Sequence, residues 1–310
     1  MITGSAVLLV ILSGIAFSGI MITYRTGQHR GIPMSHIGLF LLLGAGLFFG
    51  LRTDWSAVAA CPALIYAIGL GSGLTQYAQF RVIVLAMHRG PLSPVNCALF
   101  LGFVLVILFS WLCFGETLSV LQALGVASAV ACVLFGSFLG TGKPGAGGAH
   151  TPRQYLEYGF ILILLFVLNS LTNISFKYLS MVPEPGDGSL MHTYGMFNLM
   201  LLYAGLFACL LVEILLQKPA VRTVLRGFVP GLIGAACSAT GLWITSSLAY
   251  LPAAFVFPVS AITSILSGAI VSVTFFHERM TRAWWGMMAM GTLTAALLIA
   301  DALWSGLSAG

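Results

Sequence analysis

Arg81 and Tyr77 are four residues apart in a long apolar segment, a spacing that places both side chains on one face of a helix. An arginine presents a fork of N–H donors that matches a carboxylate or a phosphate. An ionisable side chain within a membrane costs at least about 2.5 kcal/mol, so it is a functional candidate. We therefore expect Arg81 to bind an anionic group beside Tyr77. The alternative is that Arg81 reaches the membrane rim or pairs with another side chain of the protein.

A second polar stripe consists of Asn169, Asn173 and Lys177, which follow one another at intervals of four residues. Two amides and one ammonium on a single helix face should point toward protein or water rather than lipid. We expect this stripe to bind the polar groups of a solute. The alternative is hydrogen bonding between helices, with Lys177 reaching the membrane rim.

Aromatic residues offer a third candidate surface, because Trp243 and Tyr250 share a helix face by spacing. They are expected to line a pocket opposite Tyr77 and Arg81, although aromatic side chains also serve as packing residues and interface anchors. The six cysteines form no CxxC pair, and the six histidines are scattered. The sequence therefore predicts no metal site, no cofactor and no disulfide.

The composition indicates which structural elements must position these residues. Of the 310 residues, 59% are hydrophobic and only 7% are charged, whereas a soluble domain carries roughly 25% charge. Apolar runs near 20 residues are long enough to cross a bilayer as helices. The net charge of +5 comes with no basic cluster that contains interleaved aromatics, so nucleic acid is not expected as a partner. The sequence predicts an all-α integral membrane protein.

The apolar runs predict ten transmembrane helices, and a Gly- and Pro-rich linker separates them into two groups of five. The first repeat is expected at 1–140, the linker at 141–156 and the second repeat at 157–310. The expected spans are 5–24, 37–51, 57–87, 91–114, 119–139, 157–180, 194–216, 228–251, 253–276 and 283–304. The pattern Ser119-x-x-Gln122 predicts a capping box at the start of the fifth span.

One stretch occurs twice. Each copy begins with Pro-Val, at Pro94 and Pro258, and each leaves its apolar helix at an acidic residue, Glu116 and Glu278, which are 162 positions apart. We expect the two Glu side chains to have a structural role beside the N-terminus of the next helix. Five spans per half is an odd number, so the second half should be inverted relative to the first.

The duplicated Pro…Glu-x-[Leu/Met]-[Ser/Thr]…Gly pattern resembles the drug/metabolite transporter superfamily, in its EamA-like branch. The resemblance implies ten helices, an inverted repeat and alternating access for small organic solutes. It also implies that both termini lie in the cytoplasm. The distribution of Lys and Arg indicates the opposite, because the loops after the odd-numbered spans carry ten of them and the other face carries one.

The leading hypothesis is a carrier in the cell membrane that moves an amino acid or another anionic or zwitterionic metabolite. The two halves would rock around a solute held by Arg81 and Lys177. An organic cation or drug in an aromatic-lined cavity is the alternative within this class. A membrane enzyme and a membrane partner without transport are remote alternatives, because no cluster of catalytic residues is present. The protein is expected to work as a monomer or homodimer, with the solute and the bilayer as its partners.

Overall fold

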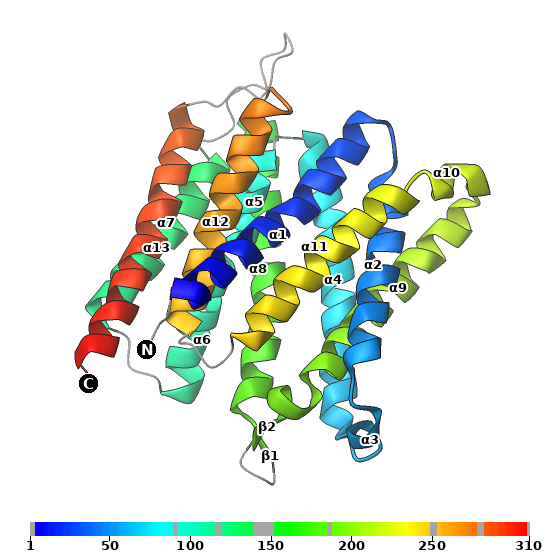
Figure 1. Cartoon of the computed structure of the whole chain (residues 1–310). Helices are drawn as coiled ribbons and strands as arrows, with labels where there is room; N and C mark the ends of the chain where they lie inside the picture. Colours follow the sequence, from blue (N-terminus) through cyan, green and yellow to red (C-terminus); the bar gives the residue numbers. More distant parts are fainter. Residues whose placement is uncertain are drawn as a thin grey trace. The chain divides into compact units, whose positions relative to one another are not determined.

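Long helices dominate the computed structural model, which describes residues 4–89, 92–115, 119–138, 152–184, 188–248, 253–277 and 282–308. Figure 1 labels the elements in chain order. They are α1 (Gly4–His29), α2 (Met34–Arg52), α3 (Trp55–Val58), α4 (Ala63–Arg89), α5 (Leu92–Phe100), α6 (Phe103–Phe114), α7 (Val120–Phe138), α8 (Pro152–Met181), β1 (Pro183–Glu184), β2 (Gly188–Ser189), α9 (Leu190–Gln217), α10 (Val221–Leu225), α11 (Phe228–Ser247), α12 (Ala253–Thr274) and α13 (Arg282–Ser308).

Six helical segments in the described part of the chain are long and apolar enough to cross a membrane, one of them made of α5 and α6 together. The segments are Ser5–His29, Met34–Arg52, Pro94–Phe114, Leu156–Met181, Leu190–Gln217 and Phe228–Thr245. Large apolar side chains such as Leu51, Leu112 and Leu216 are more than two-thirds exposed on the protein surface. Such side chains are stable against lipid rather than water. The expected class, a helical membrane protein, is confirmed at this level.

Local sequence explains where several helices begin. Ser119 and Gln122 form a reciprocal capping box at α7, because the Gln122 backbone N–H donates to Ser119 Oγ (3.1 Å) and the Ser119 N–H donates to Gln122 Oε1 (3.3 Å). This prediction is confirmed. Helix α9 begins after Ser189, whose hydroxyl accepts the His192 backbone N–H. Helix α8 begins at Pro152, where the missing N–H costs no helical hydrogen bond.

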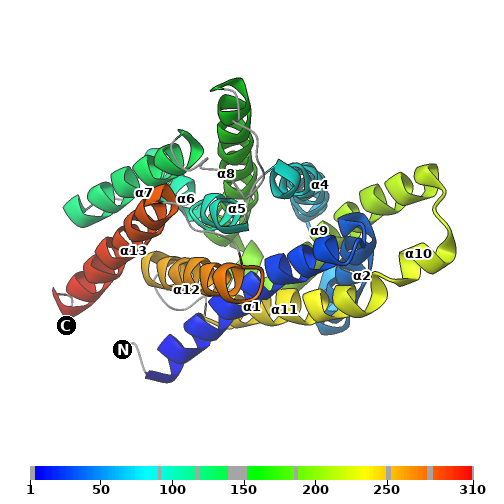
Figure 2. The same cartoon turned by 90° about the horizontal axis from the view of Figure 1, so that it is seen from above.

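The residues divide into two compact units. Unit 1 contains residues 1–21, 82–170 and 240–310, and unit 2 contains residues 22–81 and 171–239. Helices α1, α4, α8 and α11 contribute one part to each unit. Within unit 1, α5 packs against α12 and α7 packs against α13, which lie side by side in both views (Figures 1 and 2). Within unit 2, the main contact is between α2 and α9.

Unit 1 has a continuous apolar core to which six helices contribute, α5, α6, α7, α8, α12 and α13. Its centre contains Leu101, Val104, Cys132, Phe166 and Leu298. The Sγ atoms of Cys97 and Cys132 in this core lie 3.6 Å apart, and the two cysteines form no disulfide. A smaller cluster joins α1, α11 and α12 around Val10 and Ile244.

Unit 2 depends on close contact between α4 and α9. A Cβ atom on Gly73 would lie 2.8 Å from the backbone oxygen of Leu202, and one on Gly69 would lie 2.7 Å from Cβ of Leu201. The Gly69-Leu-Gly-Ser-Gly run therefore permits close helix packing at these two positions. A Cβ atom on Gly71 would have no described atom within 4 Å, so Gly71 does not contribute to this contact.

Some expected boundaries are wrong. The first helix continues to His29 because no breaker follows Tyr24, so Arg25 lies in its last turns and donates to Gln28. The third span begins at Ala63, since Pro62 interrupts the chain after the short helix α3. The linker is shorter than expected, because residues 152–156 belong to α8. Residues 139–151, which make up most of the linker, lie outside the described residues.

The predicted fourth span is divided into two helices, and the polar loop after α8 contains two short strands. Helix α5 ends at Phe100 and α6 starts at Phe103, with a turn at Leu101 and Gly102 between them. The polar loop after α8 forms a two-residue antiparallel pairing of β1 with β2, in which Pro183 pairs with Ser189.

Candidate functional site

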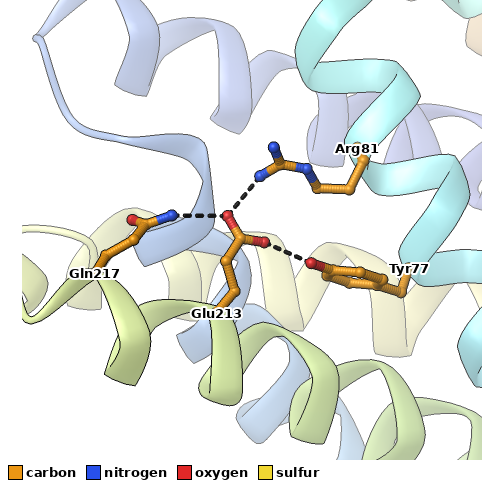
Figure 3. A network of polar contacts seen from close by, with 4 residues as sticks. All are labelled: Tyr77, Arg81, Glu213 and Gln217. Carbon is orange, nitrogen blue, oxygen red and sulfur yellow. Dashed lines mark hydrogen bonds and ion pairs between the residues drawn. The ribbon is translucent and has the colours of Figure 1, made fainter.

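A polar cluster joins α4 to α9 within unit 2, and it contains Tyr77 and Arg81 (Figure 3). Arg81 Nη1 lies 2.5 Å from Glu213 Oε1, and the Tyr77 hydroxyl donates to Glu213 Oε2 at 2.8 Å. Gln217 Nε2 also donates to Glu213 Oε1 at 3.0 Å. One carboxylate therefore receives three side-chain hydrogen bonds, one of which comes from a charged donor.

Helical spacing creates each half of this cluster. Tyr77 and Arg81 are four residues apart on α4, and Glu213 and Gln217 are four residues apart on α9, so each pair lies on one helix face. Figure 3 shows the two pairs pointing toward each other from neighbouring helices. The sequence predicted the α4 pair but not its contact with Glu213 on α9.

The ion pair is asymmetric in its exposure. The Arg81 side chain is 51% exposed, whereas the Glu213 side chain is 14% exposed. Glu213 is thus nearly enclosed by its three donors, while the guanidinium keeps further N–H donors toward open space. Because Glu213 compensates its charge, Arg81 is not an isolated cation. The alternative considered from the sequence, that Arg81 pairs with another side chain of the protein, is therefore observed.

The Asn169 side chain forms a hydrogen bond that stabilises the fold. Its Nδ2 donates to the backbone oxygen of Leu99 at 2.6 Å, next to the turn between α5 and α6. A Cβ on Gly102 would lie 2.7 Å from the same nitrogen. The Leu99 carbonyl also accepts the Gly102 backbone N–H at 3.1 Å, so the amide is its second donor at this turn. The observed contact is therefore interhelical hydrogen bonding within unit 1.

Asn173 and Lys177 lie on the same helix as Asn169, at the expected spacing of four residues, and belong to unit 2. Both side chains are half-buried. Trp243 lies on α11 in unit 1 and is 39% exposed. Tyr250 lies outside the described residues.

The residues of the repeated motif are only partly described. Glu116 and Glu278 lie outside the described residues, so their expected role beside a helix N-terminus stays a prediction. Pro94 is the third residue of α5, and Pro258 is the sixth residue of α12, so both lie early in helices as expected.

Sequence reasoning did not find two further sets of polar residues. Asp301 is 7% exposed and accepts hydrogen bonds from Ser119 Oγ and, at 2.7 Å, from Gln122 Nε2. Asn96 and Ser18 are completely buried in unit 1. The capping box of Ser119 and Gln122 gave no sign of Asp301, and no motif connects Ser18 with Asn96, because these partners are distant along the chain. Among the described residues, no three His, Cys, Asp or Glu side chains are close enough to hold a metal ion.

Comparison with known proteins defines the fold but names no activity. No protein-family model matches the sequence, and no curated protein matches it. A solved structure described only as "Crystal structure of protein" is similar over 97% of this chain and 98% of its own length, with a TM-score of 0.61 and 16% identity. This similarity shows a shared overall fold.

Proposed function

We propose that the protein is a secondary transporter that moves a small zwitterionic metabolite, such as an amino acid, across the cell membrane by alternating access. The observation that carries this proposal is the Arg81–Glu213 pair with Tyr77, which joins two apolar helices. Ionisable side chains in membrane-spanning segments are costly, and those that persist mark solute or ion pathways.

The charge balance of the pair favours a zwitterion over a simple anion. Arg81 and Glu213 together carry no net charge, so an added anion would face a carboxylate as well as a guanidinium. An amino acid brings both charges: its carboxylate fits the open donors of Arg81, and its ammonium fits an oxygen of Glu213. The Tyr77 ring adds an apolar surface beside them.

The proposal includes ten spans arranged as two inverted five-helix repeats, as in the EamA-like drug/metabolite transporters. Three observations support it. Counting α5 and α6 as one span, the described chain contains ten long helical segments. The packed pairs α2 with α9, α5 with α12 and α7 with α13 join helices five places apart in that order. The four helices that contribute to both units are also five places apart, as α1 with α8 and α4 with α11.

Thermal unfolding of the purified full chain in detergent tests the proposal. The ligands are the L-amino acids, their N-acetyl derivatives, which are anions, and their amides, which are cations. We expect at least one amino acid to raise Tm, while its two derivatives do not. A ligand at 100 times its Kd adds about 2.7 kcal/mol of apparent stability.

Matched variants separate the site from ion pairs in general. Arg81→Gln and Glu213→Gln should each abolish the ligand-dependent shift. Arg89→Gln is the control, because Arg89 also pairs with a glutamate, Glu157, at 3.2 Å, with both side chains close to half exposed. Its ligand response should match the parent protein. A response that survives Arg81→Gln and Glu213→Gln would rule out this site.

An organic cation is the second candidate, because Glu213 is a carboxylate that such a ligand could neutralise. In that case the amides raise Tm, the N-acetyl derivatives do not, and the response survives Arg81→Gln but not Glu213→Gln. The same experiment therefore distinguishes the two solute classes.

A further inference from the structure

Two polar side chains are sealed inside unit 1 without a partner from the described part of the protein. Ser18 on α1 and Asn96 on α5 are both 0% exposed. Among the described residues, nothing forms a hydrogen bond with Ser18 Oγ or with either polar atom of the Asn96 amide. An amide or hydroxyl buried in this way carries an uncompensated desolvation cost, which native proteins seldom retain without a partner.

Both groups converge on one point. A Cβ atom on Gly268 of α12 would clash with Asn96 Nδ2 and would lie 3.4 Å from Ser18 Oγ. Gly268 is also buried, and its lack of a side chain lets the amide approach the α12 backbone. The two unsatisfied groups therefore belong to one small polar site between α1, α5 and α12.

Nearby serines on the same two helices, Ser13, Ser260 and Ser264, do form hydrogen bonds. Ser13 Oγ donates to Val10 O at 2.7 Å and contacts Ser260 Oγ at 3.1 Å on the same pair of helices. Ser264 Oγ donates to Gly14 O at 2.6 Å. Gly14 O is the carbonyl four residues before Ser18, the usual acceptor for a helical serine. Because Ser264 takes that acceptor, Ser18 loses its usual local partner.

We propose that Ser18 and Asn96 form a closed binding site for one small uncharged group that both donates and accepts hydrogen bonds. Asn96 supplies N–H donors and a carbonyl acceptor, and Ser18 supplies a hydroxyl. A cation would meet the amide N–H donors, and an anion would find no positive charge in this set. A single water molecule has these properties and fits a closed site of this kind.

The test depends on the sign of a stability change in the ligand-free full chain. If a bound water satisfies Ser18, Ser18→Ala breaks a hydrogen bond and lowers Tm by about 2 °C or more. If the hydroxyl is truly unpartnered, its removal leaves Tm unchanged or raises it. Ser170→Ala is the matched control, because Ser170 is also 0% exposed but its hydroxyl donates to Phe166 O at 2.6 Å. This control should lower Tm in either case.

A double-mutant cycle with Asn96→Leu gives a second readout that a packing change alone would not produce. If both side chains bind one group, either substitution alone releases it. The Tm loss of the double variant is then smaller than the sum of the losses of the two single variants. Strictly additive changes would argue against a shared ligand, even where Asn96→Leu is itself destabilising.

The proposal is overturned if Ser18→Ala leaves the ligand-free Tm unchanged or raises it. The measurement uses no solute, so its outcome is independent of the proposed transport function.

Discussion

Gly73→Ala should destabilise the protein, whereas Gly71→Ala on the same helix should stabilise it. The new methyl group at Gly73 would lie 2.8 Å from Leu202 O and 3.0 Å from the Cα of Gly205. Both are backbone atoms of α9, so the two helices must separate rather than let a side chain rotate. Overpacking of this kind costs about 1–3 kcal/mol, which exceeds the gain of about 0.8–1 kcal/mol from replacing glycine by alanine in a helix.

Gly71 is the internal control because a Cβ there would meet nothing within 4 Å. In Gly71→Ala, only the higher helix propensity of alanine changes the stability, so the free energy of unfolding should rise by about 0.8–1 kcal/mol. The assay is thermal unfolding of both variants in one detergent, with Tm measured against the parent protein. A change of 1 kcal/mol shifts Tm by about 2–4 °C in domains of about 150–250 residues.

The two Tm values should therefore move in opposite directions. If both variants are stabilised, the α4–α9 contact at Gly73 is looser than the structure has it. If both are destabilised equally, the glycines act through the backbone and not through the space beside it. Either result would refute the reasoning from close helix contact.

Three further predictions concern single residues, each measured as a change in Tm. Asn169→Leu removes one of the two donors to Leu99 O beside a broken helix, and should cost about 0.5–1.5 kcal/mol. Ser119→Ala removes the cap of α7 and one hydrogen bond to the buried carboxylate of Asp301, and should cost about 0.5–2 kcal/mol. Gly31 has φ +65° and no described atom near the position of its missing Cβ, so Gly31→Ala should cost about 1–2 kcal/mol through the backbone alone.

Each of these has its own contrary outcome. An unchanged Tm for Asn169→Leu would mean that the Gly102 N–H alone satisfies the Leu99 carbonyl. Asn173→Leu, at a half-buried position on the same helix, gives the comparison. A rise for Ser119→Ala would show that helix propensity outweighs the cap. A rise for Gly31→Ala would show that the turn relaxes to negative φ.

Features that depend on composition and on neighbours along the chain could be predicted from the sequence. A chain with 7% charged residues has too few of them to form a water-exposed surface, so the helical membrane class follows directly. The capping box of Ser119 and Gln122 was predicted because its atoms are three residues apart. The Tyr77–Arg81 face was predicted for the same reason, since helix geometry alone brings those side chains together.

The tertiary structure decided what those faces contact. In a membrane helix, both the lipid side and the protein side are apolar, so the usual amphipathic pattern that orients a helix is weak. The sequence could not show that Arg81 meets Glu213 across 132 positions, or that Asn169 meets Leu99 across 70. It also offered no sign that Ser18 and Asn96 are enclosed together. Burial and the choice of partner depend on which helices pack against each other, and here small residues and polar pairs far apart in the chain determine that packing.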